Sequence, residues 1–198
     1  MKNIIFDIGN VLLSFQPEQY LKKYYTSSQI GDLMTIIFSS DEWVELDMGT
    51  LLMHGAIDSL VHKHPHYHDE IIFVLEHWTE MLTTIDKNIE IVKELKRKGY
   101  SLYLLSNFHL EAIQKMYKKY RFFDLFDGGV ISAEENIVKP DEKIYQILLD
   151  RYHLKAEECL FIDDSLGNIH AAQRLHIKGI HLPYLANLKE ELKAIDIL

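Results

Sequence analysis

The sequence predicts an α/β fold with a Rossmann-like core built on a parallel sheet, into which a helical cap domain is inserted. Two observations support this prediction. Short apolar runs typical of buried strands alternate with segments of helical periodicity through most of the chain. One long stretch near the N-terminus breaks the alternation and contains helical patterns only, which indicates an insertion into the core.

Five apolar runs are predicted to form the sheet, because they lack the alternation of strands with one wet face. They are Asn3–Phe6, Ser101–Leu105, Gly129–Ile131, Cys159–Ile162 and Gly179–Leu182. Helices are expected between them, where apolar residues recur every three or four positions. Their predicted ranges are Asp86–Lys98, His109–Tyr120, Asp141–Tyr152 and Ser165–Leu175. This alternation indicates right-handed crossover connections.

The stretch from residue 16 to about residue 84 contains no convincing strand pattern and is predicted to be helical. The expected helices are Pro17–Tyr25, Ser28–Phe38, Asp41–Leu46, Thr50–His62 and His68–Leu82. The stretch directly follows the first strand, and open parallel sheets bind ligands beyond the carboxyl ends of their strands. Residues 16–84 are therefore predicted to form a cap domain over a site on the core, which comprises residues 1–15 and 85–198.

The composition is that of an ordinary globular protein of 198 residues, with 47% hydrophobic and 26% charged residues. The net charge of −9 argues against nucleic-acid binding, which uses clustered Lys and Arg. A phosphate substrate is still compatible with this charge, since a metal ion and a few cations reverse the potential within one site. The single Cys159 excludes an intramolecular disulfide. With no apolar run long enough to span a bilayer and no signal-peptide cleavage pattern, a cytoplasmic protein without a membrane partner is expected.

Polar residues follow three of the predicted strands. In addition, a lysine precedes the predicted helix Asp141–Tyr152, which follows a fourth strand, Gly129–Ile131. These residues are Asp7 in FDIGNVL, Ser106 and Asn107 in LLSN, Lys139 in KPDEKIY, and Asp163 and Asp164 in FIDDSLGN. Because the carboxyl ends of parallel strands share one edge, three carboxylates, a hydroxyl and an ammonium are expected to converge there. Clustered carboxylates repel one another, and a hard cation such as Mg²⁺ makes their clustering tolerable.

The four motifs, in this order, resemble those of the haloacid dehalogenase (HAD) superfamily of hydrolases, and the resemblance covers essentially the whole chain. The helical insertion resembles the small helical cap of the first cap class, and WVELDMGTL is similar to its acidic-glycine turn. The FDxGNV opening looks most like the branch that contains α-D-glucose-1-phosphate phosphatase-like proteins and the N-terminal phosphatase domains of epoxide hydrolases.

The resemblance implies a Mg²⁺-dependent phosphatase that hydrolyses a small phosphorylated metabolite, such as a sugar phosphate, through an aspartyl-phosphate. It implies that Asp7 is the nucleophile. Asp7, the carbonyl of Gly9 and Asp164 are implied to bind Mg²⁺. Asp163 either belongs to the metal shell or orients Lys139. Neither the identity of the substrate nor the oligomeric state is predicted by the sequence.

Other residues are implied to hold the substrate. Ser106 and the backbone N–H of Asn107 would bind phosphate oxygens. Lys139 would neutralise the nucleophile and the transferring phosphoryl group. Trp43 is a candidate contact to the leaving group, because caps of this type contact that part of the substrate and aromatic faces suit sugars.

The sequence departs from the family pattern at Gly9, where the phosphatases normally carry a second aspartate. That acid protonates the leaving group and later activates water, a role worth about 10²–10⁴ in rate. Three explanations stay open. Water or a cap residue replaces the acid, with Glu45, Asp47 and His54 as candidates by region. Alternatively, the substrate is a sugar 1-phosphate, whose hemiacetal oxygen leaves more easily, or the protein only binds a phosphate ligand or a partner without turnover.

A metal-independent haloacid dehalogenase is the rival enzyme class. In that class the aspartate attacks carbon, and a tyrosine typically occupies the position of Gly9. The intact Asp163–Asp164 pair and the absence of this tyrosine favour a phosphatase. Dependence on a metal ion distinguishes the two classes, and ligand binding without phosphate release would identify a regulatory protein.

Overall fold

The computed structural model describes residues 1–198 and contains a five-stranded sheet in the order β5–β4–β1–β6–β7. The strands are β1 (Asn3–Phe6), β4 (Ser101–Ser106), β5 (Gly128–Ile131), β6 (Cys159–Asp163) and β7 (Lys178–His181). Every neighbouring pair is parallel. The predicted fold class is confirmed, and each strand overlaps a predicted one. No helix has the length and apolarity required to cross a membrane.

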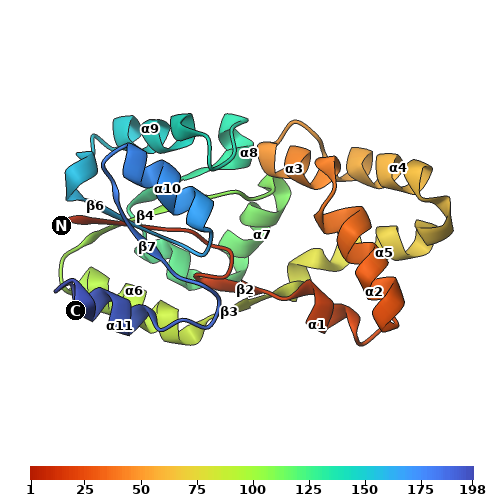
Figure 1. Cartoon of the computed structure of the whole chain (residues 1–198), viewed down its shortest axis with the longest axis horizontal. Helices are drawn as coiled ribbons and strands as arrows, with labels where there is room; N and C mark the ends of the chain where they lie inside the picture. The colour runs from red at the N-terminus through yellow and green to blue at the C-terminus, as the bar shows by residue number, and fades with distance from the viewer.

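Helices cover both faces of the sheet (Figure 1). They are α6 (Asp86–Arg97), α7 (Leu110–Lys119), α9 (Glu142–Arg151), α10 (Leu166–Arg174) and α11 (Leu188–Ala194). Successive residues of a strand point to opposite faces. In β1, Ile4 and Phe6 therefore belong to the hydrophobic cluster that includes α6, α7 and α11, whereas Ile5 belongs to the cluster with α9 and α10. The central strand is fully buried, which explains its apolar run Ile4–Phe6.

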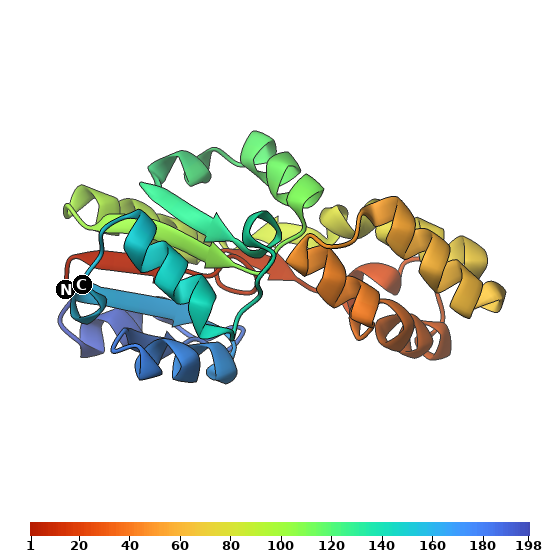
Figure 2. The ribbon, with the colours of Figure 1, turned by 90° about the horizontal axis from the view of Figure 1, so that it is seen from above.

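The residues between β1 and α6 form a helical group beyond one end of the sheet, and both chain termini lie at the opposite end (Figure 2). Its helices are α1 (Pro17–Leu21), α2 (Ser27–Leu33), α3 (Asp41–Met48), α4 (Met53–Lys63) and α5 (His68–His77). A π-helical turn at Met34–Phe38 and 3₁₀ turns at Pro65–Tyr67 and Trp78–Met81 complete the group. A helix overlaps each of the five predicted ranges. We refer to residues 16–84 as the cap.

A two-stranded ribbon, which the sequence analysis did not predict, connects the cap to the core. β2 (Leu13–Phe15) and β3 (Leu82–Thr84) pair antiparallel. The expected absence of strands from residues 16–84 is therefore wrong at the C-terminal end, and so is the helix expected to continue to Leu82. The α-helix ends at His77, and β3 pairs with a strand far away in the sequence. No local pattern reveals such a pairing, because three residues are too few to show periodicity.

Candidate active site

The predicted site residues meet at the carboxyl edge of the sheet, on the side that faces the cap. Asp7 directly follows β1, and its backbone N–H donates to the carbonyl of Ile162 in β6 at 2.9 Å. Phe6 is level with Leu104 of β4 and with Ile162 of β6. This register brings the ends of the two neighbouring strands, Ser106 and Asp163, to either side of Asp7.

Lys139 links the carboxylates of Asp7 and Asp163. Its Nζ lies 2.9 Å from Asp7 Oδ1 and donates a hydrogen bond of 2.6 Å to Asp163 Oδ2. The three residues are between 0% and 7% exposed. Nζ also lies 5.3 Å from the centre of the Phe161 ring, within the range of a cation–π contact. Charges buried this deeply require such partners, because the loss of their hydration is costly.

The same contacts determine the ionisation of the group. Burial raises the pKa of Asp7 to about 6, with Lys139 opposing the rise and Asp163 adding to it. Burial by itself lowers the pKa of Lys139, but the carboxylates of Asp7 and Asp163 outweigh burial, and the pKa is raised. Lys139 therefore stays charged and acts as an electrostatic partner rather than as a proton donor.

Hydrogen bonds from the neighbouring loops hold Asp163 and Lys139 in place. Asp163 Oδ1 accepts from the backbone N–H of Ser165 at 2.7 Å and from Asn168 Nδ2 at 3.0 Å. The side chain of Asn107 donates to the carbonyl of Lys139 at 3.0 Å and accepts from its N–H at 2.8 Å. Asn168 was not predicted, although its place in the first turn of the helix after the acidic pair is a usable signal.

Asp7, Asp163 and Asp164 each present a carboxylate oxygen within 4.8 Å of the others. The carboxylate of Asp163 accepts from Lys139, whereas the carboxylate of Asp164 accepts from Asn10 Nδ2, at 3.1 Å. Burial raises the pKa of Asp164, and the hydrogen bond from Asn10 opposes the rise. Three carboxylates thus face a single ammonium. Such an oxygen-rich, negatively charged group fits a hard cation such as Mg²⁺.

The chain turns sharply after Asp7, at Gly9 and Asn10. Asn10 has a φ of +52°, a conformation that asparagine tolerates better than most residues, and its N–H donates to the carbonyl of Leu13 at 2.7 Å. Its side-chain oxygen accepts from the N–H of Phe15 at 3.1 Å. A Cβ at Gly9 would meet only Asp7 Oδ2, at 3.9 Å. The conformation of the turn therefore explains why an asparagine occupies position 10. It does not require a glycine at position 9, where a side chain would have room.

A cavity of about 170 Å³ lies between the sheet edge and the cap. Its lining residues are Gly9, Asn10, Asn107 and Asp164, the apolar Phe15, Trp43, Trp78, Leu82 and Phe108, and Asp47. Trp43 thus forms part of the cavity wall. Of the three acid–base candidates named by region, Asp47 lines this cavity, whereas Glu45 and His54 are exposed and do not.

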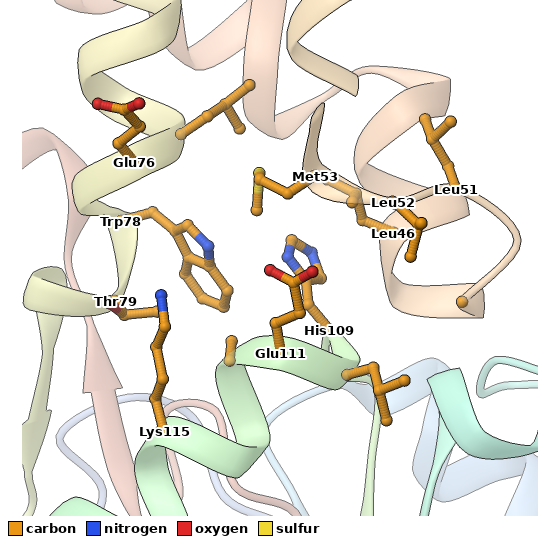
Figure 3. A pocket seen from close by; sticks show the side chains of 14 residues that line it. Leu46, Leu51, Leu52, Met53, Glu76, Trp78, Thr79, His109, Glu111 and Lys115 are labelled. Atoms are coloured by element: carbon orange, nitrogen blue, oxygen red, sulfur yellow. The ribbon is translucent and has the colours of Figure 1, made fainter. Parts of the chain in front are cut away.

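Asp47 lies beside a buried histidine that the sequence analysis did not single out. His109 Nε2 is 3.3 Å from Asp47 Oδ1, but the two groups are not aligned for a hydrogen bond, and neither ring nitrogen has a hydrogen-bond partner. The imidazole lies against Trp78, Met53 and Leu46 in the wall of a second, more apolar cavity of about 200 Å³ (Figure 3). Its position two residues after the predicted phosphate-binding Asn107 is the sequence feature that could have marked His109 as a residue near the site.

The pKa values of Asp47 and His109 shift in opposite directions. Burial lowers the pKa of His109 to about 3, so the imidazole is neutral at physiological pH. Burial raises the pKa of Asp47 to about 7, with the Asp7 carboxylate adding to the rise and Lys139 opposing it. Near neutral pH, Asp47 is therefore able both to give and to take a proton.

Comparison with known proteins identifies relatives over most of the chain. Residues 1–176 match the family of haloacid dehalogenase-like hydrolases. The sesquiterpene phosphatase astK of Aspergillus oryzae is 30% identical over 91% of this chain and 89% of that protein. The phosphoglycolate phosphatase of Aliivibrio fischeri is 22% identical over 97% of this chain and 88% of that protein. The structure of a HAD family enzyme from Bacteroides thetaiotaomicron in a magnesium complex aligns with a TM-score of 0.77, at 22% identity over 98% of both chains.

Proposed function

Because the chain belongs to the haloacid dehalogenase-like hydrolases, we propose that it is a Mg²⁺-dependent phosphatase that hydrolyses a small phosphate monoester through an aspartyl-phosphate on Asp7. The observation that carries the proposal is the buried group of Asp7, Lys139 and Asp163 beside Asp164. It combines a nucleophile, a fixed cation and a set of carboxylates that fits Mg²⁺. The predicted family and hydrolase class are confirmed, whereas the glucose-1-phosphate-type branch stays a prediction.

In the proposed reaction, a carboxylate oxygen of Asp7 attacks phosphorus. An O–P bond forms while the bond between phosphorus and the leaving oxygen breaks. Water then attacks phosphorus in the aspartyl-phosphate, releases inorganic phosphate and restores the carboxylate. Lys139, at 2.9 Å from Asp7, offsets the charge of the carboxylate and of the phosphoryl group. Ser106 and the backbone N–H of Asn107 would hold phosphoryl oxygens.

The residues that would hold Mg²⁺ are Asp7 and Asp164, whose carboxylates lie within 4.8 Å of each other, together with the carbonyl of Gly9 that the family resemblance implies. A bound Mg²⁺ would shield an anionic substrate from the carboxylates and stabilise charge on the transferring group. Both carboxylate oxygens of Asp163 accept hydrogen bonds, Oδ2 from Lys139 and both from Asn168 Nδ2. These contacts favour the role of orienting Lys139 over direct metal ligation.

The cavity wall indicates the chemistry of the leaving group. Phe15, Trp43, Trp78 and Phe108 present aromatic surface next to the catalytic carboxylates. This surface suits a leaving group with an apolar face. A sugar ring and a terpenoid alcohol both have one, and the similarity to a sesquiterpene phosphatase supports testing the second beside the first.

The test is phosphate release from a panel that contains α-D-glucose 1-phosphate, farnesyl monophosphate, sn-glycerol 3-phosphate and p-nitrophenyl phosphate. We expect release with Mg²⁺ and none with a chelator. Asp7→Asn should lose at least about 10³-fold in kcat while circular dichroism shows a folded protein. The matched control is Asp58→Asn, an exposed residue of α4, which should keep full activity.

Each rival has its own signature in this experiment. Full activity of Asp7→Asn would remove Asp7 from the mechanism. Halide release from 2-haloacids without any metal would identify a dehalogenase instead. Binding of inorganic phosphate and Mg²⁺ by a folded protein that releases no phosphate would identify a binding protein.

A further inference from the structure

The proposed phosphatase has no proton donor at Gly9, although cleavage of an alkyl phosphate leaves an alkoxide that requires a proton. A positioned acid contributes about 10²–10⁴ in rate to such a step. Two acidic residues line the cavity between core and cap, Asp164 and Asp47. Asp164 is held by Asn10 within the carboxylate cluster that fits Mg²⁺. Asp47 is therefore the carboxyl group of this cavity that is left for proton transfer.

Asp47 approaches the cavity from the side opposite the sheet. It lies in the last turn of α3, in the cap, and shares the cavity wall with Gly9 and Asn107. Its side chain is 21% exposed, and Oδ1 lies 3.3 Å from Nε2 of the neutral His109. A leaving group bound in this cavity would lie beside the turn that follows Asp7 and beside the Asp47 carboxyl, as general acid catalysis requires.

Contacts with the core hold Asp47 in this place. The hydroxyl of Ser132, the first residue of α8 (Ser132–Glu135), donates to the backbone carbonyl of Asp47. The side chain of Asn136 donates to the carbonyl of Met48 at 3.0 Å. Gly49 ends α3 with a φ of +72°, and a Cβ there would lie 2.3 Å from the carbonyl oxygen of Ala133. Only a glycine permits this close approach of cap and core.

His109 gives Asp47 a neutral neighbour. Its ring is 3% exposed and packs against Trp43 and Trp78, with centroid distances of 4.4 and 4.6 Å. Both ring nitrogens lack a hydrogen-bond partner. A neutral imidazole in an apolar wall does not force Asp47 to ionise, in contrast to the ammonium of Lys139 beside Asp7. The charged groups that act on the pKa of Asp47 are the Asp7 carboxylate, which raises it, and the Lys139 ammonium, which lowers it.

We propose that Asp47 is the general acid of the reaction, supplied by the cap in place of a side chain at Gly9. Its O–H proton passes to the leaving oxygen as the bond from that oxygen to phosphorus breaks. The resulting carboxylate then takes a proton from the water that attacks the aspartyl-phosphate, so the proton balance of the cycle closes. This inference rests on the proposed function and deepens it.

The test compares leaving groups. Asp47→Asn should lower kcat/KM about 10²–10⁴-fold for sn-glycerol 3-phosphate or farnesyl monophosphate. For p-nitrophenyl phosphate, whose phenolate leaves without protonation, the loss should be below about 10-fold. Glu45→Gln, an exposed change in the same helix, is the matched control and should alter neither rate. A merely structural role of Asp47 would lower both rates equally.

A rescue variant makes the test independent of damage to the fold. Adding Gly9→Asp to Asp47→Asn should restore at least about 10-fold of the lost rate with the alkyl phosphate, because a Cβ at Gly9 has room and the new carboxyl supplies the acid. Equal losses on both substrates, or no loss, would overturn the role of Asp47 while Asp7→Asn still abolishes release. If Asp7→Asn keeps its activity, the proposed function and this inference both fail.

Discussion

The two sides of the cavity place ionisable residues in opposite electrostatic environments. On the core side, Lys139 lies within 2.9 Å of Asp7 and Asp163, and the buried charges compensate one another. On the cap side, Asp47 and the core residue His109, which packs against Trp43 and Trp78 of the cap, lie among aromatic rings and have no cationic partner. The pairing keeps charges in place on the core side, whereas apolar burial on the cap side favours the neutral forms. The first environment suits a nucleophile, and the second suits proton transfer.

The largest expected effect comes from removing the charge compensation of the core side. Lys139→Met leaves the buried carboxylates of Asp7 and Asp163 without their cation. We expect the free energy of unfolding to fall by about 3–5 kcal/mol in the absence of metal, as for other broken buried pairs. Urea unfolding with and without Mg²⁺ measures this, and Mg²⁺ should recover part of the loss.

The control for Lys139 is a surface pair. Lys93 contacts Glu90 at 2.7 Å with both side chains largely exposed, and Lys93→Met should cost less than about 1 kcal/mol. A loss of similar size in the two variants would contradict the view that burial makes the core charges interdependent.

A smaller effect is expected at the contact that docks the cap. Gly49→Ala and Gly99→Ala both place a side chain at positive φ, +72° and +87°. Each should cost about 1–2 kcal/mol for the left-handed conformation. At Gly49 the clash of the new Cβ with Ala133 should add about 1–3 kcal/mol. Gly99 serves as the control without a clash, because nothing lies within 4 Å of a Cβ at that position.

Thermal unfolding of the two glycine variants measures the difference. Because a shift of the turn moves Asp47, Gly49→Ala should also lose activity toward alkyl phosphates more than toward p-nitrophenyl phosphate. Equal stability losses at the two positions would show that the turn does not depend on its contact with α8.

The smallest expected effect is a change in the pH dependence of stability. His109 has an ordinary pKa of 6.5 and a pKa of about 3 in the folded protein. Between these values the unfolded chain takes up a proton that the folded protein does not, so His109 destabilises the fold as the pH falls below about 6.5. The contribution reaches about 1.4 kcal/mol per pH unit.

Urea unfolding of the wild type and of His109→Gln at pH 7, 6 and 5 isolates this contribution. The raised pKa of Asp47 makes the folded protein more stable as the pH falls, over a pH range that overlaps that of His109. Asp47 is present in both proteins, so the difference between their free energies of unfolding isolates His109. The wild type should lose more stability than the variant on acidification. Parallel curves would mean that His109 takes up its proton over the same pH range in the folded and unfolded states.

The sequence by itself determined the core side of the site. The interiors of the strands are mostly apolar because helices cover both faces of the sheet, and that local pattern identifies β1, β4 and β6. Polar residues at the carboxyl ends of these strands stand out against the apolar runs: Asp7 directly follows β1, and Ser106 and Asp163 are the last residues of β4 and β6. Parallel pairing then requires them to share one edge. Local sequence and chain order suffice for such a site.

Only the tertiary structure decided the cap side. From the sequence, Asp47, Glu45 and His54 are equally good acid–base candidates, because all three lie in the same part of the cap. The docking of Gly49 against Ala133 brings Asp47 rather than the others to the cavity. The burial of His109 between two tryptophans and the pairing of β2 with β3 likewise depend on residues far apart in the chain. Local patterns predict which face of a helix is apolar, but they do not specify where a cap docks, because that depends on contacts formed after the elements themselves.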